Sequence, residues 1–216
     1  MSDAPRSPRG PSREAPGLAR HLLCAVPQLV DPNFVRSVVL ILEHSPKGAF
    51  GLVLNHRLTT PVHDMATAIG LRWAGDPAQM LGLGGPVETS RGFILHDQPG
   101  WDPLAEAITP AVFLTTSLDA VREQAETPRL GGAGTQVLVL LGYAGWGEGQ
   151  LETEMAAGNW MPVPLRVHGS AGPGVDESWL WSANPESMWG EALRSVGIDP
   201  ARLVGSALGS GKAPQA

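Results

Sequence analysis

The glycine-rich segment 142–152 has the residue types of an anion-binding loop, and it reads Gly-Tyr-Ala-Gly-Trp-Gly-Glu-Gly-Gln-Leu-Glu. It follows an apolar stretch, residues 135–141, that predicts a strand, and it leads into a predicted helix from near Glu148 to Gly158. Free backbone amides at the start of a helix attract phosphate groups, and the helix dipole adds to this attraction. The pattern therefore predicts a ligand-binding corner between a strand and a helix.

Other properties of the same segment favour a packing role. The glycine spacing matches neither a dinucleotide-binding fingerprint nor a P-loop. Glu148 and Glu152 lie near the start of the predicted helix, where they would repel an incoming anion. The glycines let the chain turn sharply while Tyr143 and Trp146 fill apolar space. We favour this packing interpretation and keep the ligand-binding corner as the alternative.

A second glycine pair, Gly84 and Gly85, precedes Pro86 and lies near Arg91. Consecutive backbone amides in such a turn can form an anion-binding nest, and a nearby guanidinium would strengthen it. An ordinary turn between two strands is the simpler interpretation, and we favour it.

Polar residues at strand ends complete a candidate pocket. Arg36 begins one apolar run, whereas His44, Asn55 and His96 each end one, so their side chains can converge on a concave surface. The candidate ligand-binding residues are Arg36, His44, Asn55, Gly84, Gly85, Arg91, His96, Gly142, Tyr143, Gly145 and Trp146.

The sequence lacks the common signatures of metal binding and nucleophilic catalysis. No His-x-His or His-Glu-x-x-His pattern occurs, and we expect no metal site and no cofactor. Ser37 and Ser117 supply hydroxyls, but the chain has no Gly-x-Ser-x-Gly elbow, and no catalytic residue is assigned. Cys24 is the single cysteine and lies in an apolar run, where a thiol is usually inert.

The remaining pattern predicts interleaved strands and helices. The predicted strands are residues 21–26, 36–44, 49–55, 79–83, 91–96, 111–115, 135–141 and 162–167, the last being an edge strand because of Pro162 and Pro164. Helices are predicted from Thr60 and Pro61 with Met65, Ala68 and Ile69 facing the core, over 118–126, from near 148, and from Asn184 and Pro185 to Gly197. The tight turn at 45–48 makes a hairpin of two of the strands, so the sheet should be mixed.

Composition indicates a soluble, acidic, single-domain protein. We expect residues 1–16 to form a disordered arm, 17–208 the domain and 209–216 a disordered tail. No apolar run is long enough to span a membrane, and no secretory signal is evident, so a cytoplasmic location is expected. The formal net charge of −6 disfavours direct nucleic-acid binding.

An ordered set of segments resembles the YqgE/AlgH family of bacterial proteins. The matching residues are Leu22, Leu23 and Pro27; Asp31, Pro32 and Phe34; 36–39; Glu43 and His44; 48–49 and 51–55; 84–87; 91–93 with Leu95 and His96; 141–146 and 149–152; Glu154, Asn159 and Trp160; and Trp189, Ala192, Leu193 and 197–199. The resemblance covers roughly residues 18–208. His56 and Arg57 depart from it, because the family usually has Lys-Pro after the asparagine.

The resemblance implies an α/β (α+β) fold with a mixed, partly barrel-like sheet surrounded by helices. It implies little about activity, because the family is largely uncharacterised and carries the label of transcriptional regulator. We expect a non-enzymatic regulatory or interaction protein that acts through an unknown protein or small-molecule partner. The alternative is a small-molecule or anion-binding module, or a cryptic enzyme, with a pocket near residues 142–146, His44 and His96.

Overall fold

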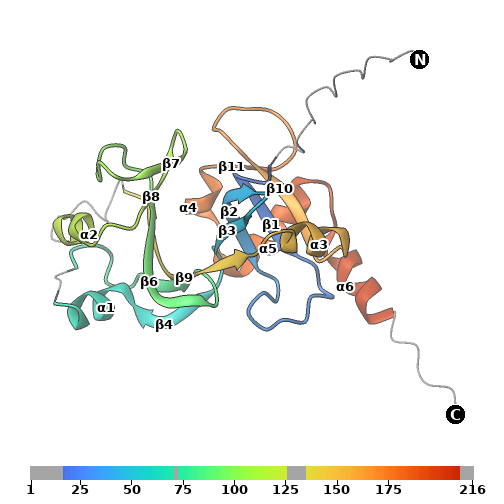
Figure 1. Cartoon of the computed structure of the whole chain (residues 1–216), viewed down its shortest axis with the longest axis horizontal. Helices are drawn as coiled ribbons and strands as arrows, with labels where there is room; N and C mark the ends of the chain where they lie inside the picture. The colour runs from blue at the N-terminus through green and yellow to red at the C-terminus, as the bar shows by residue number, and fades with distance from the viewer. Residues whose placement is uncertain (1–16, 71–72, 126–134, 210–216) are drawn as a thin grey trace, which may run out of the picture.

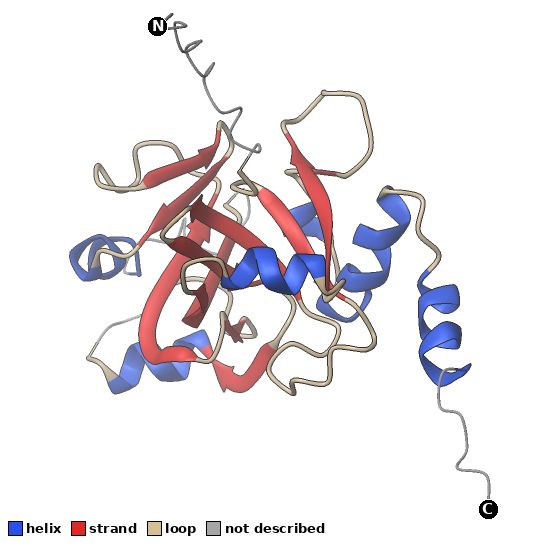
Figure 2. Ribbon diagram, turned by 45° about the vertical axis from the view of Figure 1, so that its right-hand side comes forward, coloured by secondary structure: helices blue, strands red, loops and turns tan. Residues whose placement is uncertain are grey.

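The computed structural model describes residues 17–70, 73–125 and 135–209, which form one mixed sheet with helices around it (Figures 1 and 2). The strands are β1 (His21–Ala25), β2 (Val38–Ser45), β3 (Gly48–Val53), β4 (Arg57–Pro61), β5 (Met80–Leu83), β6 (Val87–His96), β7 (Glu106–Thr109), β8 (Val112–Thr115), β9 (Val137–Trp146), β10 (Trp160–Arg166) and β11 (Val175–Asp176). The helices are α1 (Val62–Ala68), α2 (Leu118–Ala125), α3 (Gln150–Ala156), α4 (Trp179–Ser182), α5 (Pro185–Ser195) and α6 (Pro200–Gly209). The predicted arm, Glu126 and the tail from 210 onward lie outside the described residues.

The strand order is β11-β10-β1-β2-β3-β9-β6-β8-β7, and β5 pairs with both β4 and β9. Most pairs are antiparallel, but β10–β11 and β5–β9 are parallel, so the mixed sheet expected from the sequence is confirmed. In the part of the chain that the structure describes, the end strands β11 and β7 do not pair, so the sheet is not closed into a barrel. Figure 1 shows α1 and α2 beside the half with β6–β8, and α3–α6 beside the half with β1–β3.

Both faces of the β1–β2–β3 region are buried, which explains its continuous apolar runs. Leu22, Leu40 and Leu52 belong to a core cluster that also contains Trp189 of α5. Their neighbours Leu23, Val39 and Val53 point to the opposite face, where the second cluster includes Leu151 of α3. The sheet is therefore packed between α5 on one face and α3 on the other.

The course of β9 corrects the sequence prediction for residues 142–146. The strand does not end at Leu141: it bends at Gly142, whose φ is +72°, and continues to Trp146. Before the bend β9 pairs with β6, and after it Ala144, Gly145 and Trp146 pair with β3. The helix α3 accordingly begins at Gln150, later than predicted.

The start of α1 also differs from the prediction. Thr60 is not the N-cap, because β4 extends through Pro61, which pairs with Met80 of β5. The buried residues are Val62 and Ala66, whereas Ile69, predicted to face the core, is 48% exposed. Met65 packs against the core cluster that contains Val62 and Ala66, as predicted, whereas Ala68 is exposed like Ile69.

At the C-terminal end, α5 begins at Asn184 and ends before Gly197 as the sequence predicts. A further helix, α6, follows it and reaches Gly209, where a disordered tail was expected to begin. The start signal was present in the sequence: Asp199 precedes Pro200, and its carboxylate accepts a hydrogen bond from the amide of Ala201 at 3.0 Å.

Candidate functional site

A concave surface runs along the outward face of α5, and we call it the α5 groove. Its volume is about 470 Å³, within the usual range of small-ligand pockets. The lining residues are Val35, Arg36, Asn55, His56, Pro185, Glu186, Ser187, Trp189, Gly190, Arg194 and Pro200. Two of the predicted site residues, Arg36 and Asn55, therefore lie in it.

Local sequence signals position α5 beneath this groove. The side chain of Asn184 accepts a hydrogen bond from the amide of Glu186, and Pro185 occupies the first turn. The buried stripe of the helix packs on the sheet, and the indole N–H of Trp189 donates to the carbonyl of Ala25 at 2.8 Å. The side of the helix that adjoins this stripe, with Glu186, Gly190 and Arg194, lines the groove.

Arg36 forms the wall across from α5 in an unusual backbone conformation, with a φ of +51°. Asn55 holds it there: the amide Nδ2 donates to the Arg36 carbonyl at 2.9 Å, and Oδ1 accepts from the Val38 amide at 2.8 Å. The Arg36 guanidinium lies 5.6 Å from the ring centre of Trp189, close enough for a cation–π contact. Asn55 is thus a positioning residue for Arg36.

His56 also lines the groove, although the sequence did not single it out as a ligand-binding residue. Its Nε2 lies 3.3 Å from the carbonyl of Val35, so it supports the same loop that carries Arg36. Burial lowers the pKa of the His56 imidazole, partly offset by this hydrogen bond. The available signal was its position directly after Asn55.

The electrostatics of the α5 groove favour an anion. Within the described residues, neither Arg36 nor Arg194 has a carboxylate oxygen within 4.0 Å. The carboxylate of Glu191 accepts hydrogen bonds from Ser187 Oγ at 2.6 Å and from the Trp179 indole at 2.8 Å. These hydrogen bonds lower the pKa of Glu191, and Arg194 makes a smaller contribution. Glu186, at the first turn of α5, is the opposing charge on the lining.

The glycines proposed as anion nests have structural roles. At Gly84, the amide donates to the Leu141 carbonyl and the carbonyl accepts from Val53, each at 2.8 Å. A Cβ on Gly85 would overlap the Tyr143 backbone, and a Cβ on Gly142 would overlap the Gly85 carbonyl oxygen. The two backbones are in contact here, so the absence of side chains on these glycines is explained by packing.

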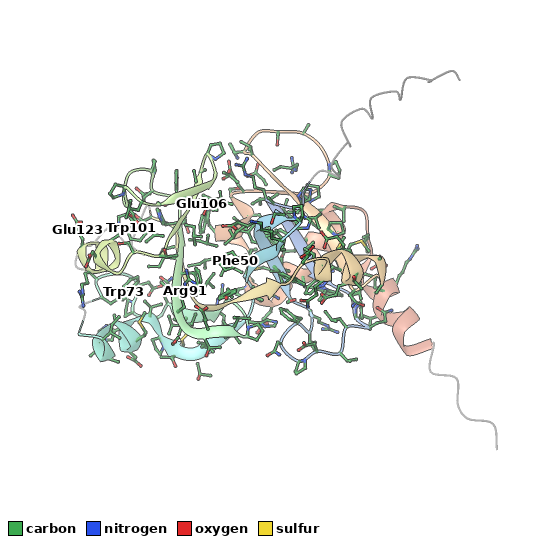
Figure 3. The ribbon with its side chains drawn as sticks, viewed as in Figure 1. Phe50, Trp73, Arg91, Trp101, Glu106 and Glu123 are labelled. Carbon is green, nitrogen blue, oxygen red and sulfur yellow. The ribbon has the colours of Figure 1, made fainter. Side chains whose placement is uncertain are left out.

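Arg91 and Tyr143 lie together near this crossing, on the surface of an aromatic cluster. Both bind Glu88: Arg91 Nη1 lies 3.3 Å from one carboxylate oxygen, and the Tyr143 hydroxyl lies 3.3 Å from the other. Arg91 also lies over Phe93, and Tyr143 packs against Phe50 with ring centres 4.9 Å apart. Figure 3 labels Arg91 and Phe50. The Arg91 charge is therefore already paired.

Trp146 is buried on the other side of the sheet. Its indole N–H donates to Glu154 Oε2 at 2.9 Å, and the indole of Trp160 donates to the same oxygen at 2.8 Å. The preceding residue, Gly145, pairs with Phe50 in the sheet. This arrangement fixes α3 to β9 and supports the packing interpretation of the segment.

His44 uses both ring nitrogens in structural contacts. Nδ1 accepts from the Leu18 amide at 2.9 Å, which places the proton of the neutral ring on Nε2. That nitrogen lies 2.8 Å from Glu152 Oε1. His44 therefore links the start of the described chain to α3 and does not face the α5 groove.

His96 lies in the other half of the molecule and is fully buried. Its ring packs against Phe113 and against Trp101, with 4.1 Å between the ring centres of His96 and Trp101. Trp101 is labelled in Figure 3. Burial lowers the pKa of His96 to about 4, so the neutral ring is strongly favoured.

Within the described residues, the candidates near residues 142–146, His44 and His96 have separate partners: His44 contacts Glu152, Tyr143 contacts Glu88, and His96 packs against Trp101. The cause is the sheet order, which places β9 between β3 and β6 with its crossing glycines fully packed. Among the residues that the structure describes, no three His, Cys, Asp or Glu side chains form a metal-binding group. Burial raises the pKa of Cys24 to about 12, as expected of an unreactive thiol.

No helix in the described ranges is long and apolar enough to cross a membrane.

Comparisons with known proteins cover nearly the whole described region. A family model described as AlgH-like matches residues 22–201. A UPF0301 protein of Myxococcus xanthus is 40% identical over 188 residues, which are 87% of this chain and 95% of the relative. Another, from Cupriavidus metallidurans, is 36% identical over 197 residues, covering 90% and 96% of the two chains.

Two solved structures have similar folds. The solution structure of the AlgH protein from Pseudomonas aeruginosa superposes with a TM-score of 0.67 and 28% identity, covering 98% of this chain and 100% of that one. A crystal structure of a protein from Corynebacterium diphtheriae has a TM-score of 0.63 and 24% identity, covering 89% and 93%, and shares the fold.

Proposed function

The chain belongs to the AlgH-like family, and from this premise and the geometry of the α5 groove we propose that it is a non-enzymatic binding protein. The groove captures a carboxylate or phosphate group of its partner, and the regulatory or interaction role expected of the protein is exerted through that capture. We also propose that it acts in the cytoplasm.

One observation carries this proposal: two guanidiniums, Arg36 and Arg194, line one concave surface without a carboxylate partner among the described residues. Like charges that share a surface repel one another, and an anion between them removes that repulsion. Arginine recognises planar carboxylate and phosphate groups through paired N–H donors. The groove is therefore complementary to an anion rather than to a cation or a neutral molecule.

Catalysis gains less support from the same geometry. His44 has both nitrogens engaged, and His96 is buried away from the α5 groove. His56 lines the groove, but the hydroxyl and carboxylate that it would need for a relay, Ser187 and Glu186, lie on α5 and make no hydrogen bond to it within the described ranges. Binding is the function that these contacts support best.

The proposal is tested by titrating isotope-labelled protein with inorganic phosphate and with succinate at constant ionic strength, observed by NMR. We expect shifts confined to residues 35–36, 55–56 and 185–194. Arg36→Ala or Arg194→Ala should each weaken binding roughly tenfold, because each removes one charge-assisted hydrogen-bond donor.

Arg122→Ala is the matched control, because Arg122 is an exposed arginine of α2 that already pairs with Asp119 at 3.8 Å. It removes the same charge from the protein but lies outside the groove lining. Equal weakening by all three variants would mean that only net charge matters, and the absence of local shifts would refute the proposal.

A further inference from the structure

We infer that the natural occupant of the α5 groove is an extended segment of a partner protein with an acidic residue at its centre and apolar residues on both sides. This inference rests on the proposed function and specifies its partner. Three features of the described residues support it: the length of the concave surface, the apolar residues along it and the position of its charges. The charge of an alternative occupant is a fourth argument.

The concave surface is longer than one small ligand. Beyond Arg194 lies a second hollow of about 310 Å³, lined by Arg194, Gly197, Ile198 and Asp199. Arg194 is a wall of both hollows, so they are neighbours along the same helix. The 11 residues of α5 span about 16 Å, which corresponds to roughly five residues of an extended chain.

Apolar residues alternate with polar ones along this surface. Val35 is 50% exposed on one side, and Pro185 and Ile198 are partly exposed toward the two ends. Exposed apolar side chains beside a concave surface are typical of protein-binding sites. A short carboxylate or a free phosphate would leave these side chains in water, whereas an extended segment would cover them.

The charged side chains of the concave surface determine where the acidic residue of the partner segment lies. Arg36 faces the middle of α5 over Trp189, and Arg194 separates the two hollows. Glu186 lies at one end, and Asp199, which pairs with Arg202 at 3.7 Å, lies at the other. Further acidic residues at the ends of the segment would be repelled, so the partner carries its negative charge centrally.

The same charges argue against other occupants. Residues 1–16 of this chain carry Arg6, Arg9 and Arg13 against Asp3 and Glu14, which gives this arm the same sign as the groove. A partner segment of opposite sign is steered to the groove and held there. A second copy of the chain is a further possible occupant, which the experiment below distinguishes.

The experiment measures fluorescence anisotropy of labelled heptapeptides on the full chain. One peptide has a central glutamate flanked by leucine and alanine, the second has glutamine in its place, and the third has lysine. We expect the glutamate peptide to bind at least tenfold tighter than the glutamine peptide and the lysine peptide not to bind.

Variants test which part of the peptide each of the two hollows binds. Arg36→Ala should weaken the glutamate peptide roughly tenfold, and Arg122→Ala should not. Ile198→Ser should weaken the peptide severalfold and leave succinate binding unchanged, because only an extended segment reaches the second hollow. Circular dichroism verifies that each variant is folded.

The outcomes separate this inference from the proposed function. If succinate binds as tightly as the glutamate peptide and Ile198→Ser affects neither, the inference of an extended peptide occupant is wrong. The proposal that the α5 groove binds an anion is then still supported. If no peptide, succinate or phosphate binds, both are wrong. If the peptides fail to bind and the protein instead associates with itself through Arg36, the occupant is a second copy and the inference is overturned.

Discussion

Histidine and asparagine were selected from the sequence by their chemistry, but their hydrogen-bond partners decide what they do. Asn55 uses both ends of its amide on backbone groups, so it acts on binding through the conformation of Arg36. His44 accepts from a backbone amide and contacts Glu152, which leaves no free nitrogen for a ligand. In the described ranges, Arg36 and Arg194 line the α5 groove without a carboxylate partner, and the proposed function rests on them.

His96 gives a prediction for the pH dependence of stability. Its pKa is lowered from 6.5 to about 4 by burial, so the unfolded chain takes up a proton at a higher pH than the folded protein does. The stability that this residue contributes is complete above pH 6.5 and is lost as the pH falls toward 4. Over this interval, we expect the free energy of unfolding of the wild type to fall by roughly 2–3 kcal/mol more than that of His96→Phe.

The measurement is urea unfolding of the wild type and the variant at several pH values between 7 and 4. His63→Phe is the control, because His63 is exposed on α1 and should keep the wild-type pH dependence. Parallel stability curves for the wild type and His96→Phe would contradict the prediction.

At the scale of elements, β9 organises the molecule. It pairs with β3, β5 and β6, and the bend at Gly142 lets one strand serve both halves of the sheet. Gly142 can adopt the positive φ of this bend and contact the Gly85 backbone because it has no Cβ. Glu154 then fixes the far end of the strand by accepting hydrogen bonds from both Trp146 and Trp160.

Replacing Gly142 tests the importance of this crossing. In Gly142→Ala, the methyl group would overlap the Gly85 carbonyl oxygen and the backbone would keep its strained positive φ. We expect a loss of more than about 3 kcal/mol in the free energy of unfolding, or failure to fold. Chemical denaturation followed by tryptophan fluorescence measures this loss.

Gly149→Ala separates the effect of steric overlap from the effect of the positive φ. Gly149 has a similar φ of +69° but no atom within 4 Å of an added Cβ. It should lose only about 1 kcal/mol, the cost of the backbone conformation alone. Equal losses in the two variants would show that the crossing itself contributes little.

At the scale of the whole molecule, the overall charge bears on whether the chain binds nucleic acid. The formal net charge is −6, and α5, which lines the α5 groove, lies in the half that contains α3–α6 (Figure 1). Two guanidiniums in a groove can hold one anionic group, but a DNA duplex needs many phosphates neutralised at once.

We therefore expect no retardation of a duplex DNA probe by the full chain at about 50 mM salt, where nonspecific electrostatic binding is strong. The measurement is an electrophoretic mobility shift at increasing protein concentration. A shift that weakens steeply with added salt, and that Arg36→Ala abolishes, would mean that the groove contacts nucleic acid.

The sequence predicted most elements whose signals are local. Apolar runs marked β1, β2, β3, β5 and β8, and Asn184 with Pro185 and Gly197 marked α5 at both ends. Such signals depend on neighbouring residues, so periodicity and capping suffice to recognise them. The same ordered segments identified the family.

The tertiary structure alone decided what Gly142 does and which residues line the α5 groove. A glycine with positive φ suits both a turn into a helix and a bend within a strand, and only pairing with β3 and β6 selects the bend. Arg36 and Arg194 are 158 positions apart in the sequence (194 minus 36) and share a surface only because α5 packs against the sheet beside β2. Contacts between distant segments form the α5 groove, and no local pattern encodes them.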